Sequence, residues 1–191
     1  MKKSRFTLYR IIVIGLMAAI VFVCTMFLGI RIPTPTGTTQ LKTANAICLL
    51  TGLLFGGWTG GFAAGIGSAL FDLTYPEYAA GAWLTFLFFF AMGAVCGAIA
   101  HSGKSRGLHK GKNWVATLCG AGAYWLLYIG KSILLLMLSG SAWQAAVIAT
   151  APKMLASGIN AVFAVVVANL LASLLRPKLE KAGVYESLNR R

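Results

Sequence analysis

The sequence predicts an all-α membrane protein with six transmembrane helices and with both termini in the cytoplasm. Hydrophobic residues make up 58% of the 191 residues and charged residues only 11%, which is too little charge for an ordinary water-facing surface. The apolar runs have the length that a bilayer core of about 30 Å requires. Most of the 17 Lys and Arg residues lie before and at the start of the first run, at 104–112 and at 176–191, and these clusters set the orientation.

The first predicted span covers residues 8–30. It is too long for the apolar region of a secretory signal peptide, and it lacks a convincing small-residue cleavage site. We therefore expect Lys2, Lys3 and Arg5 to anchor a span that stays in the mature protein.

The Gly-rich stretch that follows, at residues 44–72, decides the number of crossings. It carries Gly-Gly at 56/57 and at 60/61. Read as one helix it gives an odd number of crossings and places two of the three basic clusters outside. Read as two short helices it gives six crossings, and all three clusters lie inside, as the positive-inside bias requires. We therefore expect the chain to fold back between residues 56 and 61.

The two short helices must lie inside the bundle or be locally bent, because each is about 21 Å long, which is less than the ~30 Å core. Small residues recur at four-residue spacing in nearly every run and allow close helix packing in lipid. The expected spans, in a single domain covering residues 1–191, are 8–30, 44–56, 58–71, 81–100, 113–138 and 153–175.

Signals for catalysis, metal binding and nucleic-acid binding are weak. Gly-Lys-Ser occurs at 103–105 and 130–132, but the first glycine of a phosphate loop is missing in both places. The histidines, His101 and His109, lie in a basic loop without a nucleophile or a third metal ligand nearby. The +13 net charge gathers at the ends of membrane runs, which favours orientation and contact with anionic lipid. We expect no enzyme, no metal site and no nucleic-acid partner.

A candidate binding face lies in the fifth span. Tyr124, Tyr128 and Lys131 share one helical face by their i, i+4, i+7 spacing. Lys131 is expected roughly 12 Å from the outer end of the span, where a charge needs a wet cavity or a partner. Asp72, at the outer end of the third span, is an alternative partner in a purely structural ion pair.

Lys153 and Asn160 extend this candidate site to the sixth span. Lys153 follows Pro152, so it either opens the span at the outer rim or lies inside it after a kink. Asn160 lies two turns deeper on the same stripe. Two lysines near an outer pocket favour an anionic or strongly polar ligand. Snorkelling of Lys153 to the lipid headgroups explains its position equally well.

The outer side adds further candidates. The loop at 31–43 is rich in Pro and Thr and should be extended and ordered, either as a binding loop that uses Thr36 and Gln40 or as a plain connection. Trp83 can stack on a flat ligand or serve as an interfacial anchor.

The stretch LLTGLLFGGWTGGFAAGIGSALFDL, the chain size, the six spans and the small-residue stripe of the first span resemble the substrate-binding S components of energy-coupling factor (ECF) vitamin transporters. The resemblance covers essentially the whole chain. It implies a bacterial multi-pass cell-membrane protein that works with a transmembrane coupling (T) subunit and two cytoplasmic ATPases. These ATPases use the ATP, so this chain binds no cofactor. The positions that correspond to the family's docking stripe are Gly15 and Ala19.

The resemblance implies capture of a vitamin from outside, under the first loop and between spans four to six. The two lysines rank pantothenate and cobalamin above thiamine and leave pyridoxine and riboflavin open. Two other classes remain: a small channel or secondary carrier not driven by ATP, and a structural assembly subunit. Secondary carriers usually contain inverted repeats, which this sequence does not show.

Overall fold

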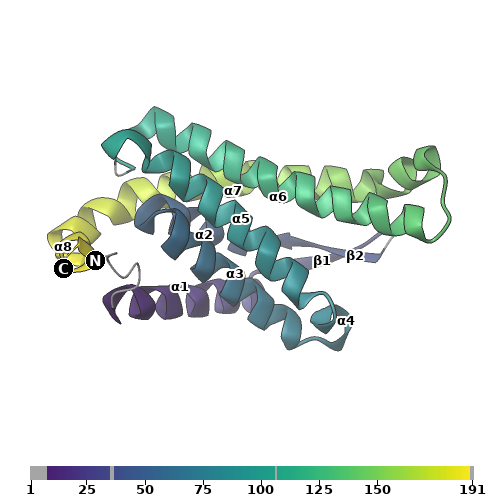
Figure 1. Ribbon diagram of the computed structural model, residues 1–191, viewed down its shortest axis with the longest axis horizontal. Coiled ribbons are helices and arrows are strands. Elements are labelled where there is room, and N and C mark those ends of the chain that lie inside the picture. The colour runs from purple at the N-terminus through teal and green to yellow at the C-terminus, as the bar shows by residue number, and fades with distance from the viewer. Residues whose placement is uncertain (1–7, 35–36, 106, 190–191) are drawn as a thin grey trace, which may run out of the picture.

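The computed structural model describes residues 8–34, 37–105 and 107–189 (Figure 1). These residues form helices and one two-stranded hairpin. Of the described helices, four are long and apolar enough to cross a membrane: α1, α5, α6 and α7. The elements are α1 (Leu8–Phe27), β1 (Gly29–Thr34), β2 (Gly37–Lys42), α2 (Ala44–Phe55), α3 (Gly57–Leu73), α4 (Pro76–Ala79), α5 (Ala82–Ala100), the short 3₁₀ helix η1 (Ser102–Lys104), α6 (Lys110–Leu138), α7 (Trp143–Lys181) and α8 (Val184–Asn189).

The chain reverses direction at Gly56, between α2 and α3. Gly56 has φ 85° and ψ 175°, a backbone conformation that side chains with a Cβ rarely adopt. Its N–H still donates to the carbonyl of Gly52 at 3.0 Å, so α2 is closed before the chain turns. The fold-back expected from the paired glycines is therefore present in the structure.

Helix α2 lies in the centre of the molecule. All of its residues except Ile47 and Phe55 are buried. It packs against α3, α5 and α7, and its side chains form much of the hydrophobic core. A helix of 12 residues is too short to span the apolar layer alone. Because α2 is surrounded by other helices, its ends do not have to reach the two surfaces of the bilayer.

Figure 1 shows how the elements divide between the two ends of the molecule. The start of α1, the α2–α3 turn, the α5–α6 connection and α8 lie at one end. The Thr34 end of β1, the Gly37 end of β2, α4 and the α6–α7 turn lie at the other. Helices α1, α2, α3, α5, α6 and α7 run between these ends in the places of the predicted spans. Which end faces the cytoplasm stays a prediction.

Two features add to the predicted helical architecture. Residues 29–34 and 37–42 form an antiparallel hairpin, with Gly29 opposite Lys42 and Thr34 opposite Gly37, in the segment that was expected to be extended and ordered. Helix α7 begins at Trp143, well before the expected start of the sixth span at residue 153, and it contains Pro152. Proline is tolerated inside a membrane helix when the surroundings satisfy the freed backbone groups. Because α7 continues through Pro152, Lys153 lies within the helix.

Helices α2, α3 and α5 meet through glycines. A Cβ added at Gly60 would lie 2.5 Å from the Cα of Gly52, and one added at Gly97 would lie 2.4 Å from the carbonyl carbon of Gly56. Such positions admit no side chain because the opposing atoms belong to the backbone and cannot rotate away. The small-residue stripes predicted in these segments are therefore sites of direct backbone contact.

We expect Gly97→Ala to destabilise the protein by about 1–3 kcal/mol, because its methyl group would overlap the backbone of the α2–α3 turn. Gly122→Ala on α6 is the matched control, since a Cβ there would have no atom within 4 Å. The midpoints of thermal unfolding in one detergent should fall for Gly97→Ala only. Equal midpoints would show that the close contact is not a constraint.

Candidate functional site

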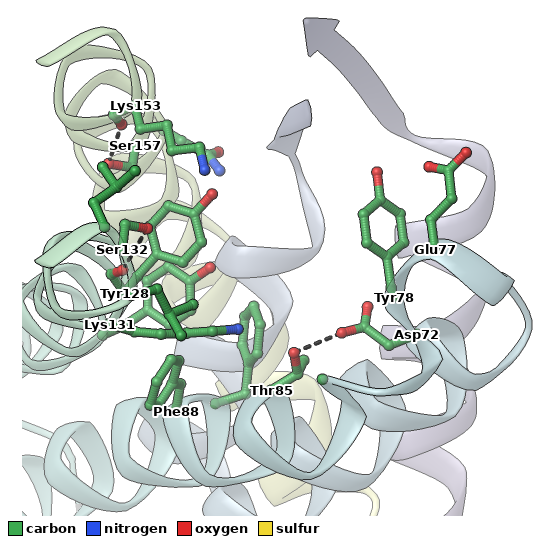
Figure 2. A pocket seen from close by; sticks show the side chains of 16 residues that line it. Asp72, Glu77, Tyr78, Thr85, Phe88, Tyr128, Lys131, Ser132, Lys153 and Ser157 are labelled. Atoms are coloured by element: carbon green, nitrogen blue, oxygen red, sulfur yellow. Dashed lines mark hydrogen bonds between the residues drawn. The ribbon is translucent and has the colours of Figure 1, made fainter. Parts of the chain in front are cut away.

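A cavity of about 450 Å³ opens among α3, α4, α5, α6 and α7, toward the end of the molecule that holds α4 (Figures 1 and 2). Its wall combines aromatic rings, hydroxyl groups, two lysines and two carboxylates. The lining residues are Asp72, Glu77, Tyr78, Gly81, Thr85, Phe88, Phe89, Tyr124, Tyr128, Lys131, Ser132, Leu135, Leu136, Lys153, Ser157 and Asn160.

Helix α6 and its neighbour α5 supply an aromatic wall. Tyr124 and Tyr128 are one turn apart, and their rings are nearly parallel, with an interplanar angle of 8° and centroids 5.8 Å apart. The Phe89 ring of α5 lies 4.6 Å from that of Tyr124. Lys131 follows on the same face of α6, as its spacing predicts. This wall offers flat apolar surface beside an ammonium group.

Helix α7 supplies a second lysine. Figure 2 shows Lys131 and Lys153 extending into the cavity from neighbouring helices. Asn160, two turns further along α7, is only 4% exposed and lines the inner part of the wall. The indole N–H of Trp125 donates to the carbonyl of Met154 at 3.3 Å, which ties α6 to α7 beside the cavity. The structure thus places two cations and an amide on one side.

The opposite side carries carboxylates. Asp72 lies at the end of α3, and Glu77 and Tyr78 lie in α4, facing the lysines across the cavity (Figure 2). Asp72 is 7% exposed and accepts a hydrogen bond from the hydroxyl of Thr85 at 2.5 Å. The described residues contain no ion pair between Asp72 and Lys131. The structural pair weighed as an alternative is therefore not formed in this structure.

One of the predicted site residues, Trp83, stands apart from this cavity. Trp83 is 63% exposed and does not line it. It precedes Thr85 by two positions, a rotation of about 200° around the helix, so it lies on the other face of α5. Thr36 lies outside the described residues, and for Gln40 only the backbone is described, paired with Arg31 in the hairpin.

The sequence interpretation missed several wall residues. Ser132 and Ser157 each follow a predicted residue by four positions, Tyr128 and Lys153 respectively, so helical spacing was a usable signal. Phe88 and Phe89 gave only a weak signal: they lie in the apolar run LTFLFFF, whose one polar residue, Thr85, precedes them by three and four positions on the same helical face.

The docking residues predicted on the first span lie elsewhere. Gly15 and Ala19 are exposed on the outer face of α1, and a Cβ at Gly15 would have no atom within 4 Å. These two small, exposed residues define the strip on α1 that the docking prediction concerns.

Comparison with known proteins identifies the family. Residues 5–177 match the family model described as "ECF-type riboflavin transporter, S component". The chain belongs to this family. Family membership confirms the predicted resemblance and makes the chain a multi-pass protein of the cell membrane and a transport subunit, not an enzyme.

One curated relative is also similar over a shorter stretch. A protein of Pyrococcus woesei, described as "Uncharacterized protein in gap 3'region", is 43% identical over 51 residues, which make up 26% of this chain. The aligned part spans about a third of that relative, 34% of its length. Its description assigns no activity.

We expect Thr85→Val to destabilise the protein by about 1–3 kcal/mol, because it removes the donor to the buried Asp72 carboxyl group. Thr85→Ser is the matched control, since it keeps the hydroxyl. Thermal unfolding midpoints should fall for the valine variant and stay close to the parent for the serine variant. An equal fall in both variants would show that the hydroxyl donor does not account for the loss of stability.

Proposed function

We propose that this chain captures riboflavin from outside the cell for an ECF-type importer. The observation that carries the proposal is the family match over residues 5–177, whose description names riboflavin. The same membership favours a transporter subunit over the secondary carrier, the channel and the structural subunit that the sequence left open.

The cavity supports a ligand of this kind. Its volume of about 450 Å³ falls within the range of about 300–1,000 Å³ that is usual for small-molecule sites. Riboflavin has a flat three-ring system with carbonyl oxygens at one edge and a chain of hydroxyls. The flat rings match the aromatic wall of Phe89, Tyr124 and Tyr128, because stacked aromatic systems attract one another.

The charges on the wall also favour a neutral polar ligand. Lys131 and Lys153 alone suggested a carboxylate or phosphate, and hence pantothenate or cobalamin. The structure adds Asp72 and Glu77 on the facing wall, so two formal positive charges oppose two carboxyl groups. Ammonium groups donate hydrogen bonds to ring carbonyls. Carboxylates accept hydrogen bonds from N–H and O–H groups. Riboflavin offers both kinds of partner, so we rank it first.

The proposed partners are a transmembrane coupling (T) subunit and two cytoplasmic ATPases. The exposed Gly15 and Ala19 on α1 support docking there, since small residues let a partner helix approach closely. ATP hydrolysis belongs to the ATPases in this proposal. The cavity end of the molecule faces outward, and the end with α8 faces the cytoplasm.

We expect Lys131→Ala to weaken riboflavin binding about ten- to a hundredfold, since a hydrogen bond to a charged group contributes about 1.5–3 kcal/mol. Trp83→Leu is the control, because Trp83 is exposed and off the cavity wall. Quenching of riboflavin fluorescence by the purified protein measures both affinities. Unchanged binding by Lys131→Ala would make the lysine structural, and tighter binding of pantothenate than of riboflavin would refute the proposed substrate.

We expect Gly15→Leu to reduce co-purification of the coupling subunit severalfold while riboflavin affinity stays at the parent value, because the larger side chain blocks the strip on α1. Gly122→Leu on α6 is the control, since that glycine also has no neighbouring atom within 4 Å of an added Cβ. The two variants should differ in recovered coupling subunit and ATPases. Equal recovery would exclude this strip as the docking surface.

A further inference from the structure

A second cavity lies at the opposite end of the molecule from the candidate site. It has a volume of about 480 Å³ and is enclosed by segments from six parts of the chain: the start of α1, the end of α2, the start of α3, the α5–α6 connection, the end of α7 and α8. It shares no residue with the first cavity. The proposed transport function does not use it.

The wall of this second cavity is cationic. Arg10 of α1 and Arg176 of α7 line it, together with His101, and Glu180 is the one carboxylate among its described lining residues. Glu180 lies 3.9 Å from the Nε of Arg176, and its side chain is half exposed, so water screens the pair. Among the described lining residues, the formal charges of the two arginines exceed that of the one carboxylate.

Arg176 is held in a fixed position at this site. Its guanidinium donates to the carbonyl of Gly107 and lies 5.7 Å from the ring centre of Tyr185. Its side chain is only 11% exposed. A guanidinium already oriented by such contacts loses little conformational freedom when it binds an anion.

Two further groups on the wall are donors. The phenolic oxygen of Tyr185 is buried, and the described residues give it no hydrogen-bond partner. A buried hydroxyl of this kind calls for a water, an ion or a ligand beside it. The amides of Gly57, Trp58 and Thr59 form the first turn of α3 and have no acceptor within that helix. The positive end of the α3 dipole therefore adds to the charge of the arginines.

We propose that this cavity binds the phosphate group of an anionic phosphate ester, held by Arg10, Arg176 and the first-turn amides of α3. The cavity is larger than a lone phosphate requires, and Trp58, Leu108 and Leu188 give it an apolar side that suits the rest of an ester. A phospholipid headgroup and a soluble phosphorylated molecule share this chemistry. Basic pockets between membrane helices on the cytoplasmic side are known to take anionic lipid headgroups.

His101 provides an internal reporter of binding. Its Nε2–H donates to the carbonyl of Leu53 at 2.9 Å, and its Nδ1 lies 3.8 Å from the position of a Cβ built on Gly56. Burial lowers the pKa of His101; the hydrogen bond to Leu53 opposes this, and nearby Arg176 lowers the pKa further. A bound phosphate stabilises the protonated ring, so it raises this pKa.

The test uses the full-length His109→Asn protein purified without a polyhistidine tag, in which His101 is the only histidine. NMR follows the ring signals of His101 as the pH is varied. One comparison uses phosphatidylcholine nanodiscs with and without phosphatidylglycerol. The other uses phosphatidylcholine nanodiscs with inorganic phosphate or with chloride at equal ionic strength. We expect phosphatidylglycerol or phosphate to raise the pKa of His101 by about half a unit to one unit. A shift with phosphatidylglycerol alone identifies a lipid site, and a shift with inorganic phosphate identifies a site open to soluble esters.

Arg10→Gln and Lys178→Gln, each added to this protein, form the matched pair. Both remove one positive charge near the same end of the molecule, but Lys178 is exposed on α7 and does not line the cavity. The shift should disappear in Arg10→Gln and persist in Lys178→Gln. Two results would overturn the proposal. One is an unchanged pKa of His101 with both probes in the protein that retains Arg10 and Lys178. The other is the same pKa shift in Arg10→Gln and in Lys178→Gln.

Discussion

The structure depends on the close contact of three helix backbones around the chain reversal at Gly56. Helices α2, α3 and α5 approach so closely at Gly52, Gly60 and Gly97 that a single added Cβ would lie 2.4–2.6 Å from backbone atoms. In a lipid environment apolar side chains gain little by leaving the solvent, so this contact relies on dispersion forces and shape. It allows a helix as short as α2 to lie buried at the centre, where other helices surround it.

This contact also positions the candidate site. Helix α3 ends at Leu73 and α5 begins at Ala82, so the tightly packed group ends near α4, whereas α6 and α7 continue past α4 (Figure 1). The cavity forms where the long helices extend beyond the short ones. Its two walls therefore come from different sources: the lysines from α6 and α7, and the carboxylates from the end of α3 and from α4.

The two ends of the molecule offer contrasting chemistry. The cavity near α4 balances two lysines against two carboxylates beside stacked rings, which suits a neutral, flat and polar ligand. Of the residues that the structure describes, the cavity near α8 combines two arginines, a buried phenol and the start of α3 with one carboxylate, which suits an anion. The proposed riboflavin site and the proposed phosphate site thus lie at opposite ends of the molecule.

The sequence by itself determined the class of protein, the reversal within the Gly-rich segment and the shared face of Tyr124, Tyr128 and Lys131. These features depend on composition, on local backbone freedom and on the period of one helix. Only the tertiary structure decided that Asp72 binds Thr85 instead of Lys131, that Glu77 and Tyr78 face the lysines, and that Trp83 points away. Phe89 belongs with these, since Thr85 is the one polar residue in its run and gives little indication of which face is lined by other helices. Such facts depend on how separate helices rotate and pack against one another, and the pattern within one helix does not contain that information.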